Sequence, residues 1–89
     1  MKKLVQVQEV EGEGLTALMG QRVLIFCMNY IYTGVLTGVN TNDILLENAA
    51  IVYETGAFTA KTFTDAQKLP FPLYIRTNSI ESYAQTDKS

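Results

Sequence analysis

The side chains of this sequence that are best suited to bind a ligand lie in two short polar turns. The candidate binding residues are Asn40, Thr41, Asn42, Asp43, Arg76 and Asn78. Amide, hydroxyl and guanidinium groups can hydrogen-bond the edges of nucleic-acid bases, and a guanidinium also binds phosphate. The same residue types are ordinary turn formers, and Arg76 could equally pair with a carboxylate such as Asp43 or Glu47 of a neighbouring subunit. Both interpretations of the two turns stand at this stage.

The residue types that most enzymes need are absent from the sequence. It contains no histidine, which excludes Ser/His and Cys/His pairs and histidine metal sites. There is no glycine-rich phosphate loop of the Walker type. Asp43 and Glu47 are carboxylates that could act as acid and base, but their turn and strand positions indicate no cleft. We therefore expect a protein that is not an enzyme and that uses no metal or other cofactor.

Composition limits the partners of the chain. Its 89 residues are enough for one small domain, and 47% of them are hydrophobic while only 18% are charged. Such an apolar chain is expected to bury surface beyond the core of one monomer, which favours a homo-oligomer. The net charge is −2, and there is no basic stripe, so strong non-specific binding to nucleic acid is not expected.

The sequence carries no sign of an oxidising or membrane environment. Cys27 is the single cysteine and lies in an apolar run, so an intrachain disulfide is excluded and a buried thiol is expected. There is no apolar stretch long enough for a signal peptide or a membrane span. We expect a soluble, cytoplasmic protein with no membrane contact.

Apolar periodicity and turn formers divide the chain into an N-terminal appendage (1–14), a domain (15–84) and a polar tail (85–89). Residues 5–10 alternate as a short strand does. A short helix follows, with Thr16 as its cap and Gly20 as its left-handed end. Strands are predicted at 23–27, 30–39 and 44–54, and two short strands flank the turn at 76–79. Residues 57–69 are predicted to be an insertion between the third and fourth strands, with room for one helical turn.

The first predicted strand has an unusual pattern, because both of its faces are apolar. Val23, Ile25 and Cys27 alternate with Leu24, Phe26 and Met28. A small antiparallel domain normally exposes one face of its sheet to water. A helix or a neighbouring subunit must therefore cover the second face. Gly34 and Gly38 in the next strand permit a sharp bend, which favours a curled sheet.

Four segments together resemble the Sm-like fold of Sm, LSm and Hfq proteins. They are GQRV at the start of a bent strand, YTGVLTGVN before a polar turn, LLENA on the next strand, and YIRTNSI near the end. The resemblance runs from about residue 15 to residue 83. The segment LLENAAIVYETG also resembles a group of small uncharacterised phage and bacterial proteins, which brings no assigned activity.

The Sm-like resemblance implies a mainly β fold: a small five-stranded, strongly bent antiparallel barrel with a short N-terminal helix. It also implies a closed ring in which the edge strands of neighbouring subunits pair. Single-stranded RNA would lie at the ring pore, held by residues 40–43 and by Arg76 and Asn78.

The sequence departs from the family pattern in both turns. Its first turn is one residue shorter, and Thr41 or Asn42 occupies the position of an aromatic residue that stacks on a base. Asp43 replaces the asparagine that reads the base, and Thr77 replaces a glycine. Two hypotheses follow. One is a ring that binds single-stranded RNA or a short nucleotide, and the other is a structural or protein-interaction ring, of phage origin, that binds no RNA.

Overall fold

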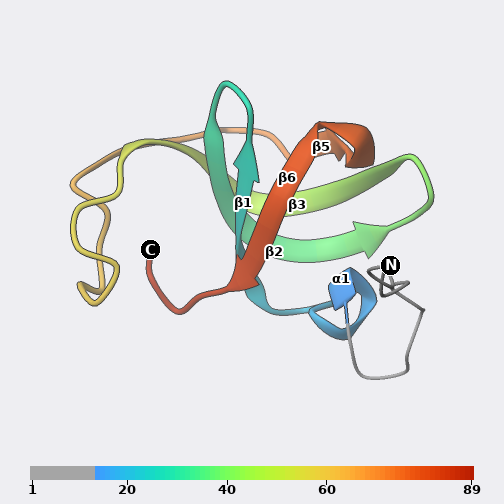
Figure 1. Ribbon diagram of the computed structural model, residues 1–89, viewed down its shortest axis with the longest axis horizontal. Coiled ribbons are helices and arrows are strands. Elements are labelled where there is room, and N and C mark those ends of the chain that lie inside the picture. The colour runs from blue at the N-terminus through green and yellow to red at the C-terminus, as the bar shows by residue number, and fades with distance from the viewer. Residues whose placement is uncertain (1–13) are drawn as a thin grey trace, which may run out of the picture.

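The computed structural model describes residues 14–89, which form one sheet of six antiparallel strands after a short helix (Figure 1). The elements are α1 (Gly14–Ala17), β1 (Arg22–Cys27), β2 (Ile31–Val39), β3 (Asp43–Glu54), β4 (Asp65–Lys68), β5 (Leu73–Arg76), the 3-10 helix η1 (Thr77–Ser79) and β6 (Ile80–Gln85). The strand order is β4-β3-β2-β1-β6, and β5 also pairs with β3. A mainly β fold with one short helix is therefore confirmed.

The first three strands are consecutive hairpins, and their limits lie within a residue or so of the predicted ones. Between β1 and β2, the Cys27 N–H donates to the Tyr30 carbonyl at 3.0 Å, so Met28 and Asn29 form a two-residue loop. Between β2 and β3, Asn40 and Asp43 close the polar turn, where the Asn40 N–H donates to the Asp43 carbonyl at 3.0 Å. Strand-forming residues with turn formers between them thus define these hairpins.

A bulge bends β3 where it crosses the start of β2. The register shifts between Thr33 and Val35, and Asn48 on the opposite strand has a positive φ of 50°. The backbones approach so closely here that a Cβ on Gly34 would lie 3.0 Å from the Glu47 carbonyl oxygen. Glycine at position 34 therefore allows the bend that was predicted from the sequence.

The core lies inside this bend. Its buried residues are Val23, Ile25, Leu36, Ile44, Leu46, Ala49 and Ile75. Leu24 on the other face of β1 is also buried, with 4% exposed. Its cross-strand neighbours are Thr33 and Ala84, and the buried Thr33 hydroxyl donates to the Val23 carbonyl at 2.9 Å. Both faces of the first half of β1 are thus covered within one subunit.

The sheet differs from the predicted five-stranded barrel in two ways. It has a sixth strand, because β4 forms inside the 57–69 segment and pairs with the second half of β3. It is also not closed: β5 pairs with β3, β6 pairs with β1, and no ladder joins β5 to β6. The first half of the 57–69 segment contains a turn, with the Ala60 N–H bonded to the Ala57 carbonyl at 3.0 Å, and no helix.

The short helix begins earlier than predicted. Thr16 lies inside α1 rather than at its cap, because the helix begins at Gly14. Gly20 has a φ of 83°, the left-handed conformation expected after a helix end. The alternating residues 5–10, and all but the last residue of the predicted appendage, lie outside the described part of the chain.

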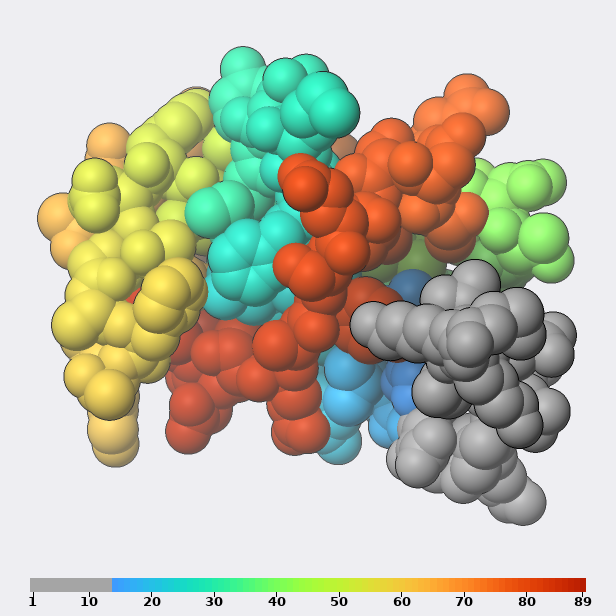
Figure 2. Space-filling view, viewed as in Figure 1, coloured from blue at the N-terminus to red at the C-terminus, as the bar shows by residue number. Residues whose placement is uncertain are grey.

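The last four residues, 86–89, pack against the insertion, and we call them the C-terminal clasp (Figure 1). The Lys88 side chain is only 2% exposed. Its Nζ donates to the carbonyls of Ala57, Ala60 and Thr62 at 2.8, 2.9 and 2.8 Å, and it lies 5.0 Å from the centre of the Phe63 ring. The predicted polar tail therefore holds the insertion in place at one end of the molecule (Figure 2).

Candidate ligand-binding surface

The structure brings the two polar turns together. Asp43 at the start of β3 lies opposite Arg76 at the end of β5. Thr77 then makes two bonds to the first turn: its N–H donates to the Asn42 carbonyl at 2.9 Å, and its Oγ1 donates to the Thr41 carbonyl at 2.8 Å. The candidate residues therefore lie on one surface, although they are more than thirty residues apart in the sequence.

Part of the first turn is occupied by its own hydrogen bonds. The Asn40 Oδ1 accepts from the N–H groups of Asn42 and Asp43, both at 2.9 Å. This is the side-chain to backbone bonding by which asparagine forms turns. The amide NH₂ of Asn40 and the exposed side chains of Thr41 and Asn42 project from a fixed backbone, so these groups could contact a ligand without rearrangement of the turn.

Arg76 and Asn78 are both exposed at the second turn. They line a groove of about 630 Å³ between this turn and the β1–β2 hairpin, together with Tyr30, Tyr32 and Tyr74. Tyr74 and Arg76 are two residues apart on β5 and so project from the same face. Within residues 14–89, no carboxylate lies within 4.0 Å of the Arg76 guanidinium. One subunit thus leaves the arginine open to a ligand or to a carboxylate of another subunit.

Thr77, which replaces a glycine of the family pattern, joins the two polar turns. It begins η1, and Asn48 is the one non-glycine residue with positive φ in the described chain, so Thr77 needs no left-handed backbone. Its hydroxyl and N–H instead join the two turns. The sequence showed that a threonine replaces the glycine of the family pattern, but it did not indicate what this threonine binds.

A group of exposed aromatic and apolar side chains surrounds the β1–β2 hairpin. Met28 is 85% exposed, Tyr30 49% and Tyr53 52%. The sequence pattern placed Met28 with Leu24 and Phe26 on the second apolar face of the first strand, which had to be covered. For Met28 this is wrong, because the two-residue loop puts it at the hairpin tip, where it is exposed. The signal was Asn29, which implied a turn but not its length.

Two ionisable groups beneath the hairpin are perturbed. Burial raises the pKa of the Cys27 thiol, and the nearby Glu81 carboxylate raises it further. Burial also raises the pKa of Tyr32, with smaller effects of Cys27 and Tyr30. The Tyr30 and Tyr32 rings lie 6.1 Å apart at 54°. Both perturbed groups are therefore neutral at pH 7, so neither is an activated nucleophile.

Other kinds of site find no support in the described chain. Within residues 14–89, no three of the Cys, Asp and Glu side chains cluster as metal ligands do. No helix there has the length and apolar character of a membrane span. No protein-family model matches this chain, and no curated protein is significantly similar to it. The function must therefore be argued from the surface itself.

Proposed function

We propose that this protein is a ring-forming Sm-like subunit that binds single-stranded RNA, or a short nucleotide, where its two polar turns meet. The observation that carries the proposal is the pair of bonds from Thr77 to Thr41 and Asn42, which holds Arg76 beside the first turn. A guanidinium for phosphate next to amides for base edges is a suitable arrangement for a single strand.

The strand order supports the Sm-like part of the proposal. A short helix precedes β1, and the five strands other than β4 follow the order β6-β1-β2-β3-β5 around one bend. The outer edges of β5 and β6 are open. Unpaired edges are templates for a further strand, so β5 of one subunit can pair with β6 of the next and close a ring.

The same surface predicts that RNA binding is weak. Asp43 lies opposite Arg76 and repels phosphate, the net charge of the chain is −2, and the first turn carries no aromatic side chain for stacking. Affinity then depends on few phosphate contacts and falls steeply with salt.

The test combines assembly with RNA binding. Light scattering is expected to report a closed cyclic oligomer. Fluorescence anisotropy with labelled hexamers of uridine and adenosine, from about 50 to about 300 mM salt, is expected to show salt-dependent binding. Arg76→Ala should weaken binding at least about tenfold and leave the oligomer intact. Lys68→Ala, which removes an exposed charge on β4, is the matched control and should have little effect.

A second candidate is a protein-interaction ring without RNA binding, which the exposed apolar side chains of the hairpin favour. It predicts no anisotropy change even at the lowest salt. If Arg76→Ala at the same time loosens the oligomer, the arginine pairs with a carboxylate between subunits and the RNA proposal fails.

A further inference from the structure

A second groove lies beside the β1–β2 hairpin and adjoins the groove that Arg76 lines. The two grooves share Cys27, Met28, Asn29, Tyr30 and Glu81. The volume of the second groove is about 570 Å³, and its lining residues come from β1, β2, β3, β6 and the hairpin loop. The turn at 40–43 does not line either groove, and Arg76 and Asn78 line only the first. We call the second groove the tyrosine groove, after Tyr30 and Tyr53.

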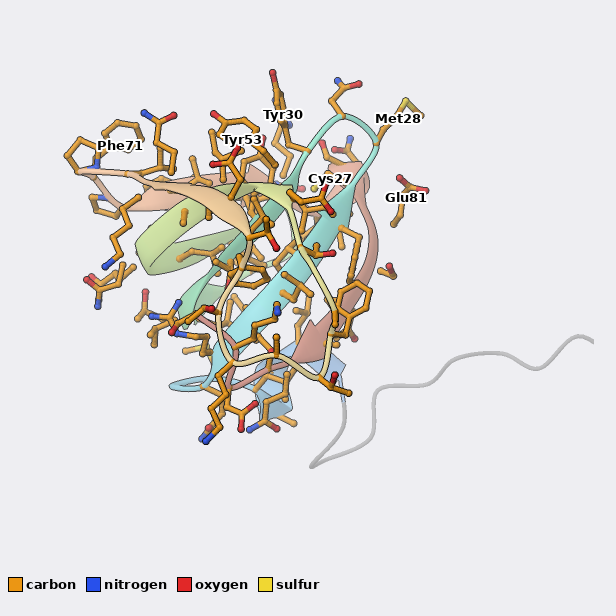
Figure 3. All side chains as sticks on the ribbon, turned by 90° about the vertical axis from the view of Figure 1, so that its left-hand side faces the viewer. Cys27, Met28, Tyr30, Tyr53, Phe71 and Glu81 are labelled. Atoms are coloured by element: carbon orange, nitrogen blue, oxygen red, sulfur yellow. The ribbon has the colours of Figure 1, made fainter. Side chains whose placement is uncertain are left out.

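The walls of the tyrosine groove combine aromatic and apolar side chains with polar ones such as Asn29 and Ser82. Tyr30 and Tyr53 are each about half exposed, and Met28 is almost fully exposed. Figure 3 shows Tyr53 and Tyr30 close together on one side of the hairpin and Met28 at its tip. Aromatic and methionine side chains left open in this way are typical of surfaces that contact a partner.

Glu81 is the one charged residue among those that line the groove. In Figure 3, Tyr53, Cys27 and Glu81 follow one another across the molecule. Within residues 14–89, no lysine or arginine nitrogen lies within 4.0 Å of the Glu81 carboxylate. Its charge acts on the groove, since Glu81 contributes to the raised pKa of Cys27, after burial.

The chemistry of these groups selects a cation. The faces of tyrosine rings carry negative potential and attract guanidinium and ammonium groups, and a carboxylate adds to that attraction. A phosphate would be repelled by the same carboxylate, and no basic residue lines this groove to offset it, whereas Arg76 lines the adjoining one. The exposed Met28 beside the charged Glu81 suits an extended segment with apolar and cationic side chains rather than an isolated ion.

We infer that the tyrosine groove binds an arginine or lysine side chain of an extended segment of a partner protein. The cationic group lies between the Tyr30 ring and the Glu81 carboxylate, and adjacent apolar side chains of the segment pack on Met28 and Tyr53. The inference does not need the RNA proposal, because no residue of the turns at 40–43 and 76–78 lines this groove. Tyr30 and Glu81 line both grooves, so the test of the inference uses peptides and not RNA.

The test uses short peptides as probes. Acetyl-Leu-Arg-Leu-amide is titrated into the ¹⁵N-labelled protein, alongside the same peptide with citrulline, a neutral analogue, in place of arginine. Amide shifts are expected at residues 27–31, 53 and 81–82, with a dissociation constant in the millimolar range, about what a tripeptide can reach. The citrulline peptide should bind at least about fivefold more weakly, because it lacks the charge.

Two glutamine variants make the result specific. Glu81→Gln should weaken binding of the arginine peptide about five- to tenfold and remove most of the difference from citrulline. Glu54→Gln changes an exposed carboxylate next to Tyr53 that does not line the groove, and it should have little effect. Equal binding of the two peptides, or shifts confined to other residues, would overturn the inference. A change of the oligomeric state in Glu81→Gln would also overturn the inference, because the groove would then be filled by a second copy of this chain and not by a partner protein.

Discussion

Replacement of Lys88 by methionine tests the most unusual contact in this structure. Methionine keeps most of the unbranched apolar stem that packs in the buried position, but it removes the ammonium group. The change therefore deletes three hydrogen bonds, to Ala57, Ala60 and Thr62, and the contact with the Phe63 ring. No charge is left buried without a partner.

The expected cost follows from these contacts. A hydrogen bond with one charged partner contributes about 1.5–3 kcal/mol net, and a cation–π contact about 0.5–2 kcal/mol. Their sum is reduced because methionine avoids the desolvation of a buried ammonium, which costs several kcal/mol. We expect the clasp to be weakened by about 2–3 kcal/mol.

Hydrogen exchange can measure this locally. The Ser89 N–H donates to the Lys61 carbonyl at 2.9 Å, and the Phe63 N–H donates to the Ser89 carbonyl at 3.2 Å, so both amides report whether the clasp is closed. In Lys88→Met they should exchange about 30- to 150-fold faster, since each 1.4 kcal/mol is a factor of ten. The Leu36 amide, bonded to the Gln21 carbonyl at 2.9 Å, should change far less.

Lys68→Met is the control, because Lys68 is exposed on β4 and makes none of these bonds. If the Phe63 and Ser89 amides exchange equally fast in the wild type and in Lys88→Met, the ammonium does not hold the clasp, and the reasoning about the three carbonyls is wrong.

Three further predictions concern the fold and the thiol. Gly34→Ala should destabilise the protein by about 1–3 kcal/mol in urea unfolding, because its Cβ would meet backbone at 3.0 Å; an unchanged midpoint would contradict the tight bulge. Thr77→Val should cost about 1 kcal/mol through the lost bond to the Thr41 carbonyl, and thermal unfolding would detect it. The pKa of Cys27 is raised, so the folded state holds the thiol proton more tightly than the unfolded state does. The contribution of this thiol to stability is therefore present below the unfolded pKa of about 8.5 and is lost as the pH rises above that value. Urea midpoints of wild type and Cys27→Ala between about pH 7 and 10 check this, and a parallel decline in both proteins would exclude the thiol.

The strands β1, β2 and β3 could be predicted because their signals are local. Alternating apolar residues and the turn formers Asn29, Asn40 and Asp43 lie within a few positions of each strand end. The meeting of the two polar turns depends on the pairing of β3 with β5. Composition does not encode that pairing, and it was expected only from the Sm-like resemblance.

The features that were missed depend on distant parts of the chain. The four residues of β4 are all exposed and show no apolar alternation, so pairing with β3 makes them a strand. Lys88 looked like a solvated tail residue, because a lysine is buried only where acceptors converge, and its three acceptors lie 26 to 31 positions away. The tyrosine groove likewise depends on the exposure of Met28 and Tyr30, which follows from the length of one loop.

The position of β1 in the sheet has a consequence for synthesis of the protein on the ribosome. Among the described strands, β1 comes first in the chain, but one of its edges pairs with β6, which comes last among them, through contacts such as Val23 with Gln85. During synthesis, this edge of β1 therefore stays open until β6 has left the ribosome. Such distant pairings slow folding, and until β6 arrives the exposed edge of β1 can pair with a second nascent chain. Polysomes, where many copies emerge side by side, are thus where this protein is most exposed to misassembly.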